Sequence, residues 1–260
     1  MDLGLKGKTA IITGGSKGIG LATAVLLAKE GANVAIVARD ESQLKEAARQ
    51  IAEQSGTEPF YVAADVSEKE QCERAVALTA ERFGGLHILV NNAGTAAARP
   101  FEQVETEDWS SDLDLKLFGA VHCARAALPH LRSAGGGAIV NVTAVGGKTP
   151  SGSSLPTSVS RAAGLALTKA MSKDLAADGI RVNAVCIGLI RSAQIERGWQ
   201  ASRPELTWEQ FAELPQHDIP LKRIGRAEEA ANVIAFLVSD AASYVTGTSV
   251  NIDGGKAAVL

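Results

Sequence analysis

Residues 9–20 read TAIITGGSKGIG, and this stretch decides the fold. Its first five residues are apolar or β-branched, which predicts a short buried strand, and the apolar run 21–30 predicts a helix after it. Between them, glycines allow a tight turn whose backbone N–H groups can approach a pyrophosphate, and the helix amino terminus adds partial positive charge. We therefore predict a phosphate-binding turn, with glycines that serve packing alone as the alternative. Its expected contact residues are Gly14, Ser16, Lys17, Gly18 and Ile19.

Six more runs rich in Val and Ile follow, separated by stretches with helical periodicity such as Glu41–Gln54 and Glu68–Phe83. The runs are apolar nearly throughout, as expected of strands buried on both faces. Strands alternating with helices predict a parallel sheet covered on both sides. No linker or repeat divides the chain, so we expect one α/β domain over residues 1–260. The predicted strands are Thr9–Thr13, Asn33–Val37, Phe60–Ala63, Ile88–Asn91, Ala138–Val142, Arg181–Cys186 and Ser249–Ile252.

The composition excludes several classes of protein. The net charge of -3 and the pI near 5.9 argue against nucleic acid as a main partner, because phosphate binding needs a basic face. No signal peptide is visible, and no apolar run reaches the roughly 18 residues of a membrane helix, so we expect a cytoplasmic protein without a membrane partner. The three cysteines lack metal-ligand spacing. We expect reduced thiols and no metal site.

Residues 191–226 interrupt the alternation of strands and helices. This insertion holds Trp199 and Trp208, two of the three tryptophans, and Thr207–Gln210 has the pattern of a helix capping box. A long insertion after the carboxyl end of a strand lies where ligands bind in such sheets, and functional sites concentrate on loops of this kind. We predict a helical lid over a substrate. A helical hairpin that pads an oligomer contact is the alternative.

The end of the second predicted strand indicates which dinucleotide binds. A carboxylate there would hold the ribose hydroxyls of NAD, whereas this chain has Ala38 followed by Arg39. A guanidinium can bind a 2′-phosphate through paired, charge-assisted hydrogen bonds, and Lys17 can add a second positive charge. We therefore predict NADP(H) as the cofactor. The alternative is a solvated Arg39 with Asp40 as a partial counter-charge.

The chain resembles the short-chain dehydrogenase/reductase family in four segments: Gly14–Gly20, Asp65-Val66, Asn91–Gly94 and Asn251–Gly255. The resemblance covers essentially the whole chain and implies a single-domain, doubly wound Rossmann fold. It also implies that Asp65 and Val66 contact the adenine. Asn92, Ala93 and Gly94 would line the adenosine ribose. Family members are commonly homotetramers paired through long helices, and the small residues of 158–177 would suit such packing.

The chain departs from the family at the positions that usually transfer the proton. The usual residues are Asn, Ser, Tyr and Lys, and the matching positions here hold Lys116, Ala144, Thr157 and Arg161. Neither tyrosine of the chain, at 61 or 244, can replace the missing one by a small shift of alignment. The family's Pro-Gly after the sixth strand is Ile187-Gly188 here. The nicotinamide-side residues implied by the resemblance are Gly188, Ile190 and Ser192, with the Ser192 hydroxyl in place of a Thr.

These replacements change the chemistry that the site can perform. A Thr hydroxyl is far less acidic than a phenol, and Arg161 can bind ribose hydroxyls but stays protonated. We hypothesise that the Lys116 ammonium occupies the space of the Tyr and acts as the acid. Burial and Arg161 would both lower its pKa. The alternative is that Lys116 pairs with Asp112, one helical turn earlier, and has no catalytic role.

We therefore expect an NADP(H)-dependent oxidoreductase that reduces a small carbonyl or activated alkene, with Lys116, Thr157 and Arg161 as the candidate catalytic residues. Two positive groups beside the nicotinamide would favour NADPH over NADP⁺ and would suit an anionic substrate. Two alternatives stay open because fold does not determine function. One is a non-catalytic sensor of NADP(H), and the other is a non-redox lyase or isomerase.

Overall fold

Seven parallel strands form the centre of the molecule: β1 (Thr9–Thr13), β2 (Asn33–Ala38), β3 (Phe60–Ala63), β4 (Ile88–Asn91), β5 (Gly137–Ala144), β6 (Ile180–Ile187) and β7 (Ser249–Ile252). The structure is a computed structural model that describes residues 2–260. Its strand order is β3-β2-β1-β4-β5-β6-β7. The chain runs outward from β1 to β3, returns to the middle and runs outward again from β4 to β7. This reversal makes the sheet doubly wound, with its switch point between β1 and β4.

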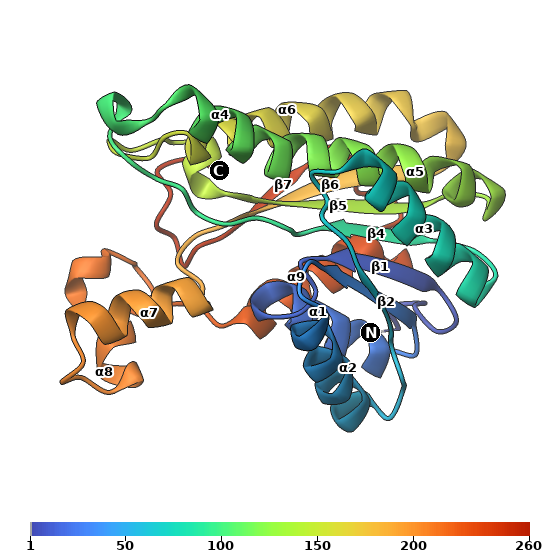
Figure 1. Ribbon diagram of the computed structural model, residues 1–260, viewed down its shortest axis with the longest axis horizontal. Coiled ribbons are helices and arrows are strands. Elements are labelled where there is room, and N and C mark those ends of the chain that lie inside the picture. The colour runs from blue at the N-terminus through green and yellow to red at the C-terminus, as the bar shows by residue number, and fades with distance from the viewer. Residues whose placement is uncertain (1) are drawn as a thin grey trace.

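The α-helices are α1 (Gly18–Lys29), α2 (Glu41–Ser55), α3 (Lys69–Phe83), α4 (Thr106–Leu113), α5 (Gly119–Ser133), α6 (Thr157–Asp174), α7 (Ala193–Ser202), α8 (Trp208–Ala212) and α9 (Ala227–Val238). Single 3-10 turns cover Phe101–Gln103, Val145–Gly147, Ala176–Asp178, Pro215–His217 and Asp240–Ala242. Helices α1, α2 and α9 cover one face of the sheet, and α3, α5 and α6 cover the other (Figure 1). The predicted α/β fold is therefore confirmed.

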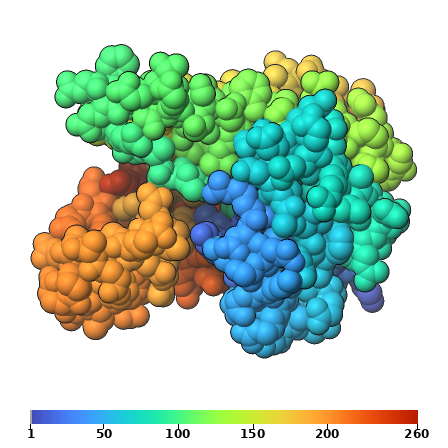
Figure 2. All heavy atoms as spheres, in the orientation of Figure 1, coloured from blue at the N-terminus to red at the C-terminus, as the bar shows by residue number. Residues whose placement is uncertain are grey.

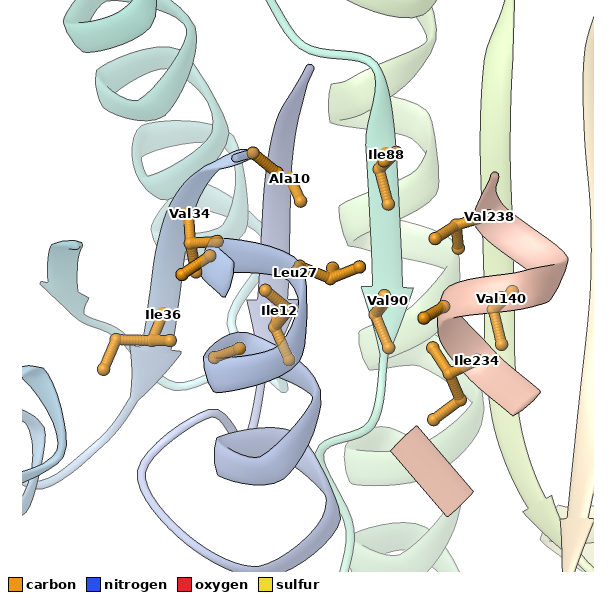
Figure 3. Close-up of a cluster of buried hydrophobic side chains, with 14 of the residues drawn as sticks. Ala10, Ile12, Leu27, Val34, Ile36, Ile88, Val90, Val140, Ile234 and Val238 are labelled. Carbon is orange, nitrogen blue, oxygen red and sulfur yellow. The ribbon is translucent and has the colours of Figure 1, made fainter. Parts of the chain in front are cut away.

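Both faces of the sheet are packed, which explains why the strands are apolar throughout. Successive strand residues point to opposite faces. Ile12 packs under α1 and α9 with Leu27, Val90 and Ile234 (Figure 3), whereas its neighbour Ile11 belongs to the core under α3 and α5. Burial of each such side chain contributes roughly 1.5–3 kcal/mol. Strand sequences without polar alternation are thus what this architecture requires.

A π-helical turn at Asp114–Phe118 joins α4 to α5 in one continuous helical segment. Such single wide turns are rare and occur frequently at functional sites. This one contains Lys116, whose side chain is 1% exposed. The turn therefore introduces a buried cation on the side of the helical segment that packs against α6.

Residues 191–226 form a separate unit that projects from the body of the molecule (Figure 1, orange). A bridge between Ile190 and Gly225 closes its base, and the predicted capping box is present: Thr207 Oγ1 accepts from the Gln210 backbone at 3.3 Å. The unit has a small apolar core of its own around Phe211. Its members include Ala212, Ile219, Ile224, Leu189, Ile195, Trp199, Leu206, Trp208 and Leu214.

No helix within residues 2–260 is long and apolar enough to cross a bilayer. The same residues contain no cluster of three or more His, Cys, Asp or Glu side chains that could hold a metal ion. The thiols of Cys72, Cys123 and Cys186 are free and buried.

Candidate active site

The glycine turn after β1 is tied to the segment that follows β4. The Asn92 side-chain amide donates to the carbonyl oxygens of Thr13 and Gly14 at 3.0 and 3.1 Å, and the Ala93 backbone N–H donates to Thr13 Oγ1 at 3.1 Å. A side chain at Gly14 would meet Asn92 Nδ2 at 2.9 Å, and Gly14 also has a φ of +63°. Glycine is therefore required where the two segments meet at the switch point.

The first turn of α1 is open to an anion. No side chain caps this helix, because Lys17 at the N-cap position makes no capping hydrogen bond. A Cβ added at Gly18 would find no atom within 4 Å, so there is free space in front of the turn. Uncapped N–H groups and the helix dipole together make such a terminus an anion-binding site.

Arg39 follows β2 and is 69% exposed. Its nearest carboxylate is Asp65, at 3.7 Å, whereas Asp40 caps α2 by accepting from the Gln43 backbone at 3.0 Å. Burial acts to raise the pKa of Asp65, but hydrogen bonds from Ser67 and the charge of Arg39 outweigh it, so the pKa is lowered. Arg39 therefore keeps most of its guanidinium free, and Asp40 is not its counter-charge.

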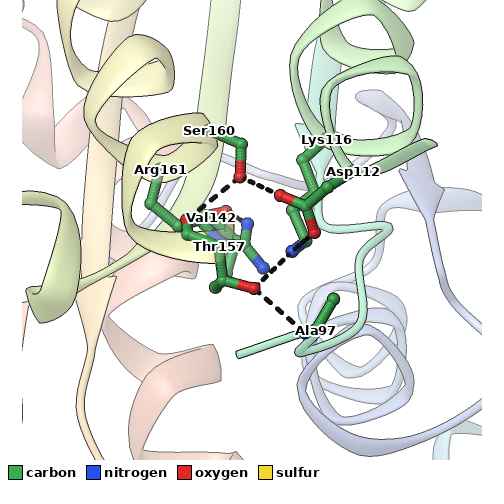
Figure 4. Close-up of polar contacts among 7 residues, drawn as sticks. All are labelled: Ala97, Asp112, Lys116, Val142, Thr157, Ser160 and Arg161. Carbon is green, nitrogen blue, oxygen red and sulfur yellow. Dashed lines mark hydrogen bonds and ion pairs between the residues drawn. The ribbon is translucent and has the colours of Figure 1, made fainter. Parts of the chain in front are cut away.

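A buried polar network lies between the helical segment α4–α5 and the start of α6 (Figure 4). Lys116 Nζ forms an ion pair with Asp112 Oδ1 and donates to Thr157 Oγ1 at 3.1 Å. Ser160 Oγ donates to Asp112 Oδ2 at 2.5 Å, and the Ala97 backbone N–H donates to Thr157 Oγ1 at 3.0 Å. The predicted candidates Lys116 and Thr157 are thus in direct contact. The alternative partner Asp112 is present as well.

Arg161 lies between this network and the segment after β4. Its Nη1 donates to the Val142 carbonyl at 2.7 Å, and its Nη2 lies 2.8 Å from the position that a Cβ of Gly94 would occupy. Burial lowers the pKa of Arg161 and the charge of Asp112 raises it, but a guanidinium stays protonated in either case. Arg161 is therefore a fixed positive charge at the site.

The pKa of Lys116 is lowered from its ordinary value. Burial is the main cause and the charge of Arg161 adds to it, while the hydrogen bond and charge of Asp112 act in the opposite direction. An ammonium with a lowered pKa is a better proton donor at neutral pH than a solvated lysine. The electrostatics therefore match those of a candidate acid.

A small cavity of about 20 Å³ links the two halves of the site, because Thr13, Ala93, Lys116 and Arg161 all line it. Two buried polar atoms on its wall, Asn91 Oδ1 and Arg161 Nε, have no hydrogen-bond partner within residues 2–260. Thr13, which ends β1 just before the glycine turn, therefore lines the same cavity as Lys116 and Arg161. A hollow visible in Figure 2 separates α4 (green) from residues 191–226 (orange).

The other predicted contact residues lie around the same edge of the sheet. Val66 is buried against Gly119, where an added Cβ would meet Val66 Cγ2 at 2.9 Å. Gly188 follows β6 and packs closely on Asp253, while Ile190 is buried at the base of the unit formed by residues 191–226. Ser192 caps α7 by accepting from the Ile195 backbone at 3.3 Å, and its hydroxyl proton is still able to donate.

Four polar side chains that could have completed the site point elsewhere. Thr143 Oγ1 donates to the Val185 carbonyl at 3.1 Å, so it faces β6. Lys148 donates to Asn251 Oδ1 at 2.7 Å, and His217 bonds the Phe211 carbonyl at 2.7 Å within residues 191–226. Tyr244 is fully exposed beyond α9. None of these groups contacts the Lys116 network.

Comparison with known proteins identifies the family. The family model described as Enoyl-(Acyl carrier protein) reductase matches residues 14–257. A short-chain oxidoreductase from Pseudomonas aeruginosa PAO1, described as containing an atypical catalytic center, is 37% identical with a TM-score of 0.95, covering 99% of this chain and 100% of that one. The chain belongs to the short-chain dehydrogenase/reductase family.

Two further members of this family have named activities. The 3-oxoacyl-(acyl-carrier-protein) reductase FabG of Staphylococcus aureus (strain Mu50 / ATCC 700699) is 32% identical over 248 residues, covering 95% of this chain and 97% of that protein. L-Sorbose reductase from Gluconobacter frateurii, solved in complex with NADPH and L-sorbose, is 35% identical with a TM-score of 0.93. That alignment covers 100% of both chains. Both relatives are reductases of the short-chain dehydrogenase/reductase family.

Sequence reasoning about this short-chain dehydrogenase/reductase missed two contributors. Ser160 reaches Asp112 from α6, and Ala97 reaches Thr157 from the loop after β4. The Asp112–Lys116 spacing was visible in the sequence, but the contacts that cross from one segment to another were not. The loop is held there by Arg99, whose backbone N–H donates to the Leu155 carbonyl at 2.8 Å.

Proposed function

We propose that the protein is an NADP(H)-dependent oxidoreductase that acts as a reductase on a small carbonyl or activated alkene substrate. The observation that carries the proposal is the cavity lined by Thr13, which directly precedes the glycine turn, and by Lys116 and Arg161. It supports a phosphate-binding turn and a proton-donating group close to one switch point, where ligands bind in doubly wound sheets.

The residues around the turn fit NADP(H). The uncapped start of α1 and the space in front of Gly18 would take the pyrophosphate. Arg39 and Lys17, both exposed, would hold the 2′-phosphate. Asp65, Val66, Asn92, Ala93 and Gly94 would complete the adenosine side. When bound, NADPH supplies a hydride. Relatives from Pseudomonas aeruginosa and Gluconobacter frateurii have been solved with NADPH, which supports this choice.

The proton would come from an atypical group. Lys116, Ala144, Thr157 and Arg161 stand where the family usually has Asn, Ser, Tyr and Lys, so this chain is a divergent member without the usual acid. Lys116 would act as proton donor, and Arg161 would hold the nicotinamide ribose beside Gly188, Ile190 and Ser192. The atypical center described for the Pseudomonas aeruginosa relative supports a functional site of unusual composition.

The cations Lys116 and Arg161 and the predicted lid provide arguments about the charge and the polarity of the substrate. Arg161 and Lys116 would favour an anionic substrate in the hollow between α4 and residues 191–226. The aromatic side chains of the lid do not argue for an apolar substrate, because Trp199, Trp208 and Phe211 pack on one another with ring centroids 5.7–6.3 Å apart.

Deuteride transfer tests the proposal. The protein is incubated with NADPH deuterated on its reactive carbon and a pool of aldehydes, ketones, keto acids and enones, and the products are analysed by mass spectrometry. We expect label in at least one product. A thermal-shift control verifies cofactor binding, which adds about 2.7 kcal/mol of stability at a hundredfold excess over Kd.

The variants Lys116→Met and Lys173→Met make the test specific. Lys173 is an exposed lysine in the last turn of α6, so its replacement removes the same charge away from the site. Loss of a positioned acid costs about 10²–10⁴ in rate, which we expect for Lys116→Met alone. Binding of NADPH without label in any product would overturn the proposal and point to a sensor or a non-redox enzyme.

A further inference from the structure

Asp112 is a carboxylate in the interior of the protein, with a side chain only 2% exposed. A buried carboxylate is strongly unfavourable unless charge and hydrogen bonds compensate it. Both of its oxygens are engaged: Oδ1 with the Lys116 ammonium and Oδ2 with the Ser160 hydroxyl at 2.5 Å. The carboxylate is therefore held from two helical segments and cannot rotate without breaking a contact.

The position of Asp112 determines where the Lys116 ammonium lies. Residues four apart share one side of a helix, so Asp112 and Lys116 can pair across the start of the π turn. The pair lies against α6, where Ser160 and Thr157 are on adjacent turns. Ser160 bonds the carboxylate and Thr157 bonds the ammonium. The two contacts together align the ion pair with the Thr157 hydroxyl.

The hydrogen bonds of Thr157 leave its proton available. A hydroxyl has two acceptor lone pairs and one donor hydrogen. The Ala97 N–H and the Lys116 ammonium occupy both acceptor positions of Thr157 Oγ1, at 3.0 and 3.1 Å. Within residues 2–260 the hydroxyl donates to no protein acceptor. Its hydrogen is therefore oriented away from both donors and is free for a ligand oxygen.

We propose that Asp112 is a positioning residue for proton delivery: with Ser160 it holds Lys116 against Thr157, so that the Thr157 hydroxyl hands its proton to the substrate. The proposal rests on the reductase function proposed above. It adds a role for the carboxylate and the order in which the proton passes. Asp112 does not touch the substrate.

For a carbonyl substrate, the carbonyl carbon would gain the hydride that bound NADPH supplies on oxidation to NADP⁺, and the π electrons of the C=O bond would move to oxygen. That oxygen takes the Thr157 proton while Thr157 Oγ1 takes one from the Lys116 ammonium, so no free alkoxide forms on Thr157. Lys116 is left as a neutral amine beside Asp112 and regains its proton from solvent. The net change is one hydride and one proton added to the carbonyl.

Two charged groups act on Lys116 from the elements packed against it. Asp112 on α4 stabilises the ammonium, and Arg161 on α6 destabilises it; the other polar neighbours on β4, β5 and α6 are neutral amides and hydroxyls. Removing the carboxylate leaves burial and Arg161 unopposed. The pKa of Lys116 would then fall further, and the amine would be neutral over more of the working pH range.

Lysine NMR on the full chain tests this without turnover. The protein is labelled with 13C at the lysine ε carbons, and the Lys116 signal is assigned as the one lost in the double variant Lys116→Met/Asp112→Asn. We expect it to titrate at lower pH in Asp112→Asn than in the wild type. The matched control is Asp114→Asn, which removes an exposed carboxylate two residues away and should leave the titration unchanged. An unmoved Lys116 signal in Asp112→Asn would overturn the proposal.

Ser160→Ala covers the case in which Asp112→Asn does not fold. It leaves both charges in place but removes the hydrogen bond to Asp112, and we expect a smaller shift of the Lys116 titration in the same direction. No shift in this variant would overturn the proposal equally. A separate assay measures deuteride transfer to the carbonyl pool against pH. In Asp112→Asn, the alkaline limb of this pH–rate profile should move to lower pH. The rate of transfer at neutral pH should fall by up to about 10²-fold.

The two assays separate the two proposals. Absence of transfer in the wild type contradicts the reductase function whatever the NMR shows. Transfer in the wild type with an unmoved alkaline limb in Asp112→Asn contradicts the role of Asp112 alone.

Discussion

At the scale of single residues, Arg39 determines the expected choice of cofactor. It follows β2 with 69% of its side chain exposed, and Asp65 at 3.7 Å is too distant to occupy the guanidinium. We expect Arg39→Ala to weaken NADPH binding by about 10- to 150-fold, the equivalent of about 1.5–3 kcal/mol for a charge-assisted contact. NADH, which lacks the phosphate, should bind the variant and the wild type alike. Calorimetric titration with both cofactors measures this.

The matched control for Arg39 is Arg49→Ala on α2. Arg49 is also exposed, but it is paired with Glu46 and Glu53 on the same helix. It should not change the affinity for either cofactor. An equal loss of NADPH and NADH affinity in Arg39→Ala would contradict a phosphate-specific role.

The buried pair Asp112–Lys116 makes a second prediction, on stability. With side chains 2% and 1% exposed, removal of either partner leaves an uncompensated charge, so we expect Asp112→Asn or Lys116→Met to cost about 3–5 kcal/mol. The loss of unfolding free energy in the double variant should be smaller than the sum of the two single losses by more than about 1 kcal/mol, as for other residues in direct contact. Urea unfolding of the four proteins measures the coupling.

The exposed pair Glu41–Lys45 is the control for this cycle. It has the same spacing, but its side chains are 59% and 61% exposed. Its coupling should be only about 0.3–0.5 kcal/mol. Additive losses at Asp112 and Lys116 would show that the ion pair contributes no interaction energy.

The sequence could nominate Lys116, Thr157 and Arg161 as candidates because they stand at aligned positions next to recognisable neighbours. It could not show that Lys116 bonds Asp112 and Thr157 at once, because pairing with Asp112 was the alternative to a catalytic role. The alternative counter-charge for Arg39, Asp40, instead caps α2. Contacts between side chains far apart in sequence depend on how helices pack, and that information is not local.

At the scale of elements, strands were predicted best. The runs at residues 9–13, 60–63, 88–91 and 249–252 match the observed strands end to end, and β5 and β6 extend past their predicted limits by one or two residues. Burial on both faces makes these segments uniformly apolar, which is a strong signal. The π turn at Asp114–Phe118 has no such signal. It contains Lys116, which is buried and contacts Thr157 of α6, a contact that is not local in sequence.

At the junction between residues 191–226 and α9, we predict an effect of pH on stability. Glu229 accepts from both Nη atoms of Arg223 at 2.9 and 2.6 Å and from the Arg226 backbone at 2.7 Å, and these contacts lower its pKa from 4.5 to about 2. A carboxyl group whose pKa is lower in the folded than in the unfolded state stabilises the fold at pH values above its unfolded-state pKa. This contribution is therefore present at neutral pH and is lost as pH falls through about 2. We expect Glu229→Gln to cost about 0.5–1 kcal/mol at pH 7, a small value because the pair is partly exposed.

Denaturant unfolding of wild type and Glu229→Gln at pH 7 and at pH 2 measures this effect. The two proteins should differ at pH 7 and converge at pH 2. Glu228→Gln, a substitution of the exposed neighbouring acid on α9, is the control and should have little effect at either pH. A difference that persists at pH 2 would assign the cost to packing and not to charge.

At the scale of the whole molecule, the doubly wound topology explains why distant parts of the chain form one site. The end of β1, the loop after β4 and the start of α6 are separated by about 80 and 60 residues. Even so, the Asn92 backbone N–H donates to Thr13 Oγ1 and the Ala97 backbone N–H donates to Thr157 Oγ1. Parallel strands bring all their carboxyl ends to one edge, and the reversal between β1 and β4 opens the space there. The sheet therefore specifies the position of the site, and the side chains specify its chemistry.

For the whole molecule we also predict how copies of the chain assemble. The outer side of α6 exposes Val159, Ala162, Ala166 and Ala170, spaced three or four residues apart. Small side chains on one helix face allow two helices to approach closely, so we expect α6 to pair with its copy in a homotetramer of four 26.9-kDa chains. Light scattering coupled to size-exclusion chromatography should give the mass of four chains for the wild type and for Ala166→Ser. Ala166→Arg adds a long cation in the middle of the face and should give a smaller species with unchanged secondary structure. A tetramer that survives Ala166→Arg would show that the chains associate through another surface.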